Sequence, residues 1–147
     1  MQSMLFAILI VSAAGICVAV QSPMNAALGR GIGSGVVAAA VSFGIGFLVL
    51  LGLSVLMGQA AAFSRVTTMP PLLLLGGALG AFFVWSMLWA VPTLGALTAI
   101  TALILGQMAA ALMIDATGLF GMTVQAITPT RLAAAALVGA GLVLSRV

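Results

Sequence analysis

Five long apolar stretches, separated by short clusters of glycine, proline and polar residues, make up most of the chain. A helix needs roughly 20 mainly apolar residues to cross a bilayer, and clusters of Gly, Pro and polar residues are typical of turns. The pattern therefore predicts five transmembrane helices. Their residue ranges, all within one transmembrane domain of residues 1–147, are about 4–28, 36–57, 71–91, 95–115 and 129–144. Because five is an odd number, we expect the two termini on opposite sides of the membrane.

The end of the first stretch carries polar residues that a lipid-facing helix would not tolerate. Gln21 and Asn25 are four residues apart, so they share one face of a helix. Pro23, between them, has no N–H to donate and predicts a helix kink. At membrane depth such groups persist where protein or a water-filled cavity satisfies them. We expect Gln21 and Asn25 to line a cavity; the alternative is that the helix ends near Ser22, at the membrane surface.

The connections between the stretches are short. Residues 29–35, G-R-G-I-G-S-G, predict a flexible turn, and they lack the preceding strand and the following Lys of a phosphate-binding loop. Pro70 and Pro71 suit the first turn of the third helix, where a missing N–H costs little. Pro92 and Gly95 predict a very short link, so the third and fourth helices should form a tight antiparallel hairpin.

Three further residues inside the apolar stretches are candidates for a substrate cavity. Ser42 is a polar residue of the second stretch. Gln107 lies near the centre of the fourth, where it would either bond to a neighbouring helix or line a cavity. Trp89 is expected to anchor the helix at the membrane surface, whereas Trp85, one turn deeper, is a candidate cavity wall.

The composition decides the class of protein and excludes several functions. The chain is 65% hydrophobic and 3% charged, with a mean hydropathy of +1.44, which indicates an integral membrane protein. Its basic residues are four scattered arginines, so no basic surface for nucleic acid is expected. With no His and a single acidic residue, the chain cannot assemble a catalytic triad, a carboxylate pair or a metal cage. We therefore expect no enzymatic activity, no metal and no cofactor.

The single carboxylate side chain, Asp115, ends the fourth stretch, and Arg131 opens the fifth on the same side of the membrane. A carboxylate inside a membrane is a candidate proton or cation site. Charges near the ends of spans are much cheaper than central ones, however, which favours an ion pair at the helix ends or contact with water.

The arginines are balanced between the two sides of the membrane. With five spans, Arg65 and Arg131 fall on the side of the N-terminus, and Arg30 and Arg146 fall on the other. An excess of Lys and Arg in short loops normally decides which side stays cytoplasmic. Without such an excess the chain should insert in both orientations, which permits an antiparallel homodimer. The alternative is that another feature, such as the N-terminal amine, orients every copy alike.

Several motifs taken together resemble one known family. They are Gln21-x-x-x-Asn25, Ser42-Phe43-x-x-Gly46, G-G-A-L-G-A at 76–81, Pro92-x-x-Gly95, Gly106-Gln107 and Ile114-Asp115-x-x-Gly118-Leu119-Phe120-Gly121. This order is similar to the YdcZ-like family of small bacterial inner-membrane proteins in the drug/metabolite transporter superfamily. The resemblance implies an all-α subunit of five transmembrane helices, an antiparallel dual-topology homodimer of ten helices, and kinship with small multidrug resistance exporters.

The resemblance implies a transporter, with one departure from those exporters. They use a glutamate in the first span, where this chain offers Gln21 and Asn25, so a neutral or zwitterionic substrate is as reasonable as proton-for-cation exchange. We expect a multi-pass protein of the bacterial inner membrane that moves a small metabolite or drug-like solute by alternating access at the dimer interface. Its expected partners are a second copy, the lipid bilayer and the solute. A passive pore, or a non-transporting subunit of a larger membrane complex, is the alternative.

Overall fold

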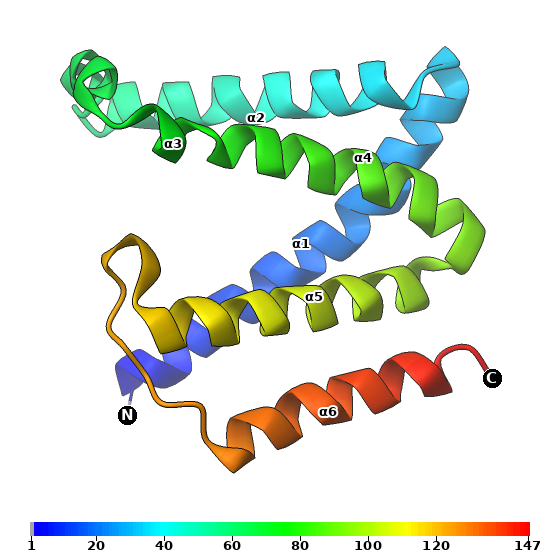
Figure 1. Ribbon diagram of the computed structural model, residues 1–147. Coiled ribbons are helices and arrows are strands. Elements are labelled where there is room, and N and C mark those ends of the chain that lie inside the picture. The colour runs from blue at the N-terminus through cyan, green and yellow to red at the C-terminus, as the bar shows by residue number, and fades with distance from the viewer. Residues whose placement is uncertain (1) are drawn as a thin grey trace. The chain divides into compact units, whose positions relative to one another are not determined.

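The computed structural model describes residues 2–147, with side chains from Met4 onward, and these residues form helices and connecting loops without a strand (Figure 1). The elements are α1 (Gln2–Ile32), α2 (Gly35–Leu56), the 3₁₀ helix η1 (Ala60–Thr68), α3 (Pro71–Leu74), α4 (Gly76–Leu94), α5 (Ala96–Thr117), the 3₁₀ helix η2 (Leu119–Gly121) and α6 (Pro129–Leu144). They divide into two compact units, Met1–Pro92 and Thr93–Val147, which are described separately.

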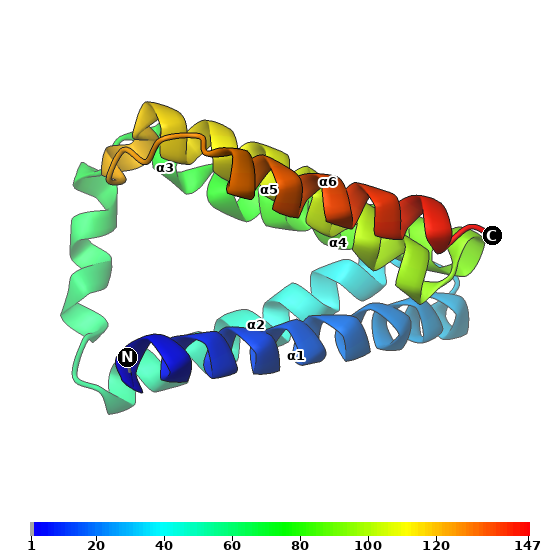
Figure 2. The same cartoon turned by 90° about the horizontal axis from the view of Figure 1, so that it is seen from below.

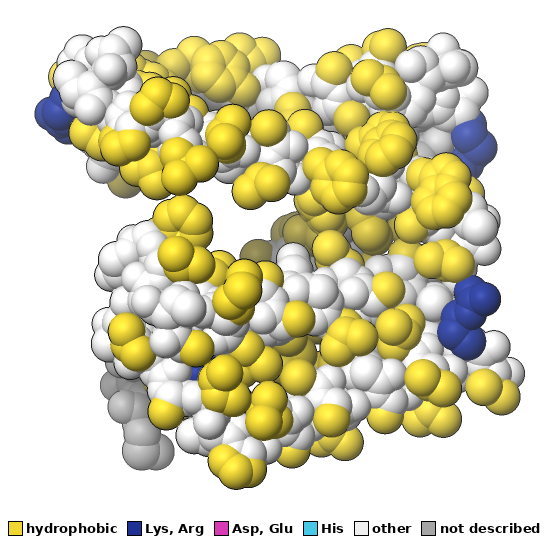
Figure 3. Space-filling view, in the orientation of Figure 1, with side chains coloured by type: hydrophobic (Ala, Val, Ile, Leu, Met, Phe, Trp, Pro, Cys, Tyr) yellow, Lys and Arg dark blue, Asp and Glu magenta, His cyan; other side chains and the backbone are white. Residues whose placement is uncertain are grey.

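Four of the helical segments are long and apolar enough to cross a membrane. They are Met4–Ile32, Gly35–Leu56, Pro71–Leu94 and Ala96–Thr117, whereas α6 is apolar but shorter. Large apolar side chains are exposed along them, and in Figure 3 they are spread over the helices in view rather than gathered in one patch. Helices satisfy their own backbone hydrogen bonds, and exposed apolar side chains are compatible with lipid, so helices with apolar surfaces are stable in a bilayer. The chain is therefore an all-helical membrane protein.

The first helix is longer than the predicted span and passes through its proline. α1 is continuous across Pro23 and ends at Ile32, rather than near Ser22 or at Leu28. Pro23 removes one backbone donor, and the Ser22 hydroxyl donates to the Val18 carbonyl one turn earlier, at 3.1 Å. Loss of one bond in a helix of this length does not end it. Consequently the turn predicted for residues 29–35 contracts to the two residues between α1 and α2.

Those two residues have the chemistry that a tight helix–helix turn requires. Gly33 has a φ of +75°, a conformation that glycine adopts without strain. Ser34 caps α2, its hydroxyl accepting a hydrogen bond from the Val37 N–H at 3.3 Å. The chain therefore reverses direction within Gly33 and Ser34.

Small residues hold α1 and α2 together next to this turn. Ala26 and Ala38 are 5% and 0% exposed. A Cβ added to Gly29 would lie 3.2 Å from the Cα of Gly35, so the two backbones approach more closely there than a larger residue permits. Away from the turn the two helices diverge (Figure 1).

The third segment begins as predicted and ends later. Pro71 occupies the first turn of α3, where its missing N–H is harmless. The interpretation of Pro92 as the start of a link is wrong, because α4 continues through it to Leu94. A proline in the last turn of a helix removes a single hydrogen bond, so the helix continues to Leu94 and ends at Gly95, which has a φ of +81°.

The second unit is an antiparallel helical hairpin. Figures 1 and 2 both show α5 and α6 side by side. Near the start of α5, the Thr98 hydroxyl donates to the carbonyl of Ser145, just beyond α6, at 3.2 Å. Midway along, a Cβ on Gly139 would lie 3.8 Å from Leu105, so small residues again allow the contact.

The loop of this hairpin depends on a glycine. Gly118 ends α5 in the left-handed conformation, with φ +67°, and its N–H donates to the Ile114 carbonyl at 2.8 Å. A Cβ at this position would lie 2.8 Å from a methyl of Val124 and 3.1 Å from the Met122 carbonyl oxygen. Both the conformation and the space therefore require glycine.

We predict that Gly118→Ala lowers the free energy of unfolding by about 1–3 kcal/mol, the cost of holding a non-glycine residue at this φ. Denaturant unfolding in detergent measures the loss. Gly141→Ala is the matched control, because a Cβ there meets nothing within 4 Å inside α6. Its stability should be unchanged or up to about 1 kcal/mol higher. Equal stabilities for the two variants would contradict the role given to Gly118.

Candidate functional site

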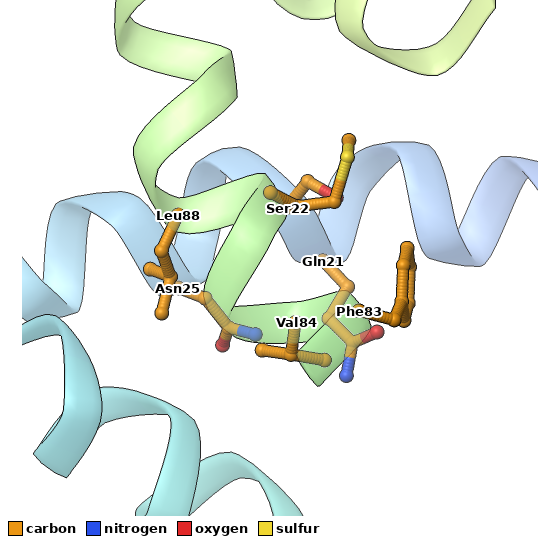
Figure 4. A pocket seen from close by; sticks show the side chains of 7 residues that line it. Gln21, Ser22, Asn25, Phe83, Val84 and Leu88 are labelled. Atoms are coloured by element: carbon orange, nitrogen blue, oxygen red, sulfur yellow. The ribbon is translucent and has the colours of Figure 1, made fainter. Parts of the chain in front are cut away.

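The polar residues of α1 face a polar residue of α2 in the first unit. The Gln21 side-chain N–H donates to the Ser42 hydroxyl at 3.3 Å, across 21 positions of sequence. Asn25 lies one turn further along the same face of α1, and Figure 4 shows the amides of Gln21 and Asn25 on either side of Val84 from α4. The structure thus brings together Gln21, Asn25 and Ser42, three of the five residues predicted to line a cavity.

Two open grooves meet at the Gln21–Ser42 hydrogen bond. The larger, of about 750 Å³, lies between α1 and α2, and the other, of about 520 Å³, lies between α2 and α4. Both volumes fall in the range of about 300–1,000 Å³ that is typical of small-molecule sites. Gln21 and Ser42 line both grooves, and Asn25 lines the larger. The other walls are mostly apolar: Ile16, Cys17, Val20, Met24, Leu28, Val41 and Ile45 in the larger groove, and Phe43, Phe47, Leu50, Phe83 and Val84 in the second.

A smaller pocket between α1 and α4 is the most buried part of this region. Its polar residues are Gln21, Ser22 and Asn25, of which Ser22 and Asn25 are only 6% and 7% exposed. Val84 and Met87, which face them from α4, are 7% and 5% exposed. Gln21, by contrast, is exposed, because it faces the open grooves. The polar face of α1 is therefore buried at one end and open at the other.

No charged side chain lines these three spaces. The single carboxylate side chain, Asp115, belongs to the second unit, and Arg30 lines a separate groove beside the α1–α2 turn. Among the described residues, no three His, Cys, Asp or Glu side chains gather into a potential metal site. The grooves thus offer neutral hydrogen-bonding groups and apolar walls, and no acid, base or counter-ion.

Two predicted cavity residues, Trp85 and Gln107, are not among the residues that line these three spaces. Trp85 is 51% exposed and contacts Phe82, with ring centroids 6.1 Å apart, on the face of α4 that the grooves do not use. Gln107 is an exposed residue of α5, in the second unit. Three residues that form the α4 wall, Phe83, Val84 and Met87, were not predicted from the sequence. They are apolar like their neighbours, so only their spacing on the helix distinguishes them from lipid-facing residues.

An ion pair joins the two helices of the second unit. The Arg131 guanidinium contacts the Asp115 carboxylate, and the two side chains are 30% and 21% exposed. Arg131 also donates to the Ala126 carbonyl at 3.4 Å, and the Asp115 carbonyl accepts from the Gln125 N–H at 2.8 Å. The pair therefore fastens the end of α5 and the start of α6 to the loop between them. This arrangement gives Asp115 a structural partner within its own unit.

One protein family matches nearly the whole chain. Its description reads "Putative inner membrane exporter, YdcZ", and the match covers residues 6–144. The chain belongs to the YdcZ family. Neither a search of curated proteins nor a search of solved structures returned a match. Membership of the YdcZ family, together with several membrane-length helices, makes the chain a multi-pass protein of the inner membrane and a membrane transporter.

We predict a modest, specific coupling between Asp115 and Arg131. In a double-mutant cycle, Asp115→Ala and Arg131→Ala should show a coupling free energy of unfolding of about 1 kcal/mol, because the pair is partly exposed. Asp115→Ala combined with Arg146→Ala is the control and should be additive, since Arg146 lies beyond the opposite end of α6.

We also predict that Asp115→Asn affects the free energy of unfolding more than the transport rate per folded molecule. A stable variant that lost all dependence on a pH gradient would instead make Asp115 the coupling residue.

Proposed function

We propose that this YdcZ-family chain is one half of a transporter in which two copies, inserted in opposite orientations, enclose a solute cavity. The observation that carries the proposal is the hydrogen bond between Gln21 and Ser42, which lies between two open grooves of solute size. Each copy would supply Gln21, Asn25 and Ser42 to the cavity. Alternating access would then exchange two equivalent arrangements of the pair.

Gln21 supports a covering partner. It is an exposed amide on a membrane-length helix, and its single hydrogen bond leaves its carbonyl and second N–H unused within the described residues. Such groups are costly in hydrocarbon unless protein or water contacts them. The grooves on both sides are open, so a second subunit or cavity water has access to Gln21. A homodimer interface over these grooves satisfies this requirement with no further component.

The antiparallel arrangement depends on α6 as a fifth span. α6 has 16 residues, which gives a length of about 24 Å at 1.5 Å per residue. This is short of a hydrocarbon core of about 30 Å, a mismatch that local thinning of the bilayer accommodates at modest cost. With α6 as a span, two arginines fall on each side of the membrane, and neither orientation is favoured.

Two antiparallel copies give alternating access a symmetric basis. A two-fold axis in the membrane plane makes the inward-open and outward-open states of a homodimer equivalent, as inverted repeats do in larger transporters. The cavity then lies at the subunit interface, where each copy contributes the same polar face of α1.

We predict that Gln21→Ala and Asn25→Ala each lower transport at least about fivefold, the equivalent of one lost hydrogen bond of about 1 kcal/mol. Uptake into proteoliposomes measures the effect, with a solute identified by screening amino acids, nucleosides, polyamines and quaternary ammonium compounds. Gln59→Ala is the control, because this exposed amide lies in the connection after α2, outside the grooves. Wild-type uptake by both α1 variants would remove the cavity assignment.

We further predict that two variants locked in opposite orientations complement each other. Two lysines added beside the α1–α2 turn in one variant, and two added to residues 58–69 in another, should fix opposite orientations, because the added charge stays cytoplasmic. Cysteine accessibility from each side of the membrane checks the orientation. Each variant alone should be inactive, and co-expression should restore transport. Full activity from either one alone would rule out the antiparallel dimer.

A further inference from the structure

Asn25 is a mostly buried residue whose amide has no hydrogen-bond partner among the described residues and borders two open spaces. It is 7% exposed, and within the described residues its amide makes no hydrogen bond. The neighbouring Ser22, equally buried, donates its hydroxyl to the Val18 carbonyl. An asparagine amide has two N–H donors and an acceptor oxygen. The described residues contain no buried side-chain N or O atom without a hydrogen-bond partner, so the amide of Asn25 reaches the spaces that it lines and is available there to a group from outside the subunit's own chain.

The position of Asn25 shows where such a group would enter. Asn25 lines both the small pocket between α1 and α4 and the groove of about 750 Å³ between α1 and α2. Figure 4 shows its amide beside Val84, with the amide of Gln21 beyond. Met24 and Val20, from α1, add apolar surface to the larger groove. A ligand in that groove would meet an apolar wall along most of its length and an amide at the buried end.

The charges of the site exclude ionic ligands. The unit Met1–Pro92 contains no Asp or Glu, and its arginines line neither space that Asn25 borders. A cation or an anion would therefore lose its hydration without gaining a counter-ion, which is strongly unfavourable. A neutral ligand loses much less, and the apolar wall favours it. Recognition then depends on hydrogen bonds to the amides.

We propose that Asn25 recognises an uncharged ligand that carries a carboxamide-like edge, a carbonyl beside an N–H, on an apolar body. Such an edge pairs with the asparagine amide through two hydrogen bonds that run in opposite directions, so donor and acceptor are both satisfied. This inference rests on the proposed function in one respect, namely that the ligand is the transported solute. The amide pairing itself concerns binding and is measured without transport.

Four naphthalene derivatives with a common apolar body separate the possible classes. They are naphthalene-2-carboxamide, methyl 2-naphthoate as an acceptor without a donor, 2-naphthoate as an anion, and (2-naphthylmethyl)trimethylammonium as a cation. Equilibrium dialysis against the full chain in lipid nanodiscs, with protein-free nanodiscs subtracted, gives each affinity. We expect the carboxamide to bind about tenfold more tightly than the ester, and both ions to bind more weakly than the ester.

Two substitutions assign the preference to Asn25. Asn25→Leu keeps the branched shape and the number of heavy atoms and removes the amide, so it should lower carboxamide affinity about tenfold while changing ester affinity less than threefold. Asn25→Asp keeps the shape and introduces a carboxylate, so it should reverse the preference between carboxamide and ammonium. Gln59→Leu, which removes an exposed amide away from the grooves, is the control and should leave all four affinities unchanged.

The outcomes distinguish this inference from the transport proposal. Binding of the cation at least as tightly as the carboxamide, equal loss of amide and ester in Asn25→Leu, or no binding of any probe would overturn it. Carboxamide binding that depends on Asn25, without carboxamide uptake into proteoliposomes, would sustain the recognition site and contradict its role in transport. Transport of a different solute class, with no carboxamide binding, would sustain the transporter and overturn the ligand class.

Discussion

The bilayer's lack of hydrogen-bonding partners is the constraint on which the rest of this structure depends. Helices meet it for the backbone, so long helical segments form the chain. Side-chain hydroxyls mostly meet it locally, as Ser22 and Thr101 do by donating to carbonyls one turn earlier. The amides of Gln21 and Asn25 have no such local solution. Their location in the grooves of the first unit therefore carries most of the functional information.

In both compact units, helices pack together through small residues, but the polar contacts beside those residues differ. Helices in lipid gain little from burying apolar surface, so they associate where small residues let their backbones approach. In the first unit this happens at Gly29 and Ala38, beside a two-residue turn. In the second unit Gly139 plays the same part, and polar contacts at both ends of the hairpin add to it. In the first pair of helices the closest contacts lie beside the turn, and the groove opens further along, between residues 16–28 of α1 and 41–46 of α2.

This difference assigns different roles to the polar residues of the two units. Asp115 and Arg131 contact one another and the loop beside them, so their charges are used within the hairpin. Gln21 and Asn25 retain unused hydrogen-bonding capacity next to spaces of solute size. In the proposed transporter, the amides of Gln21 and Asn25 would contact the solute, whereas Asp115 is held in the ion pair of its own hairpin.

The sequence by itself determined the class of protein and the polar face of α1. Hydropathy specifies membrane-length helices because lipid excludes polar backbone, and a four-residue spacing places Gln21 and Asn25 on one face whatever surrounds them. Helix ends were harder to predict: the first helix was expected to end near Leu28 and Pro92 to open a link, yet α1 continues through Pro23 to Ile32 and α4 through Pro92 to Leu94, because a helix survives the loss of one hydrogen bond. Only the tertiary structure paired Gln21 with Ser42 and placed Phe83 and Val84, rather than Trp85, against the grooves. In the sequence, an apolar residue that faces lipid cannot be distinguished from one that faces a neighbouring helix. Only the packing of the helices decides which apolar side chains form the wall of a groove.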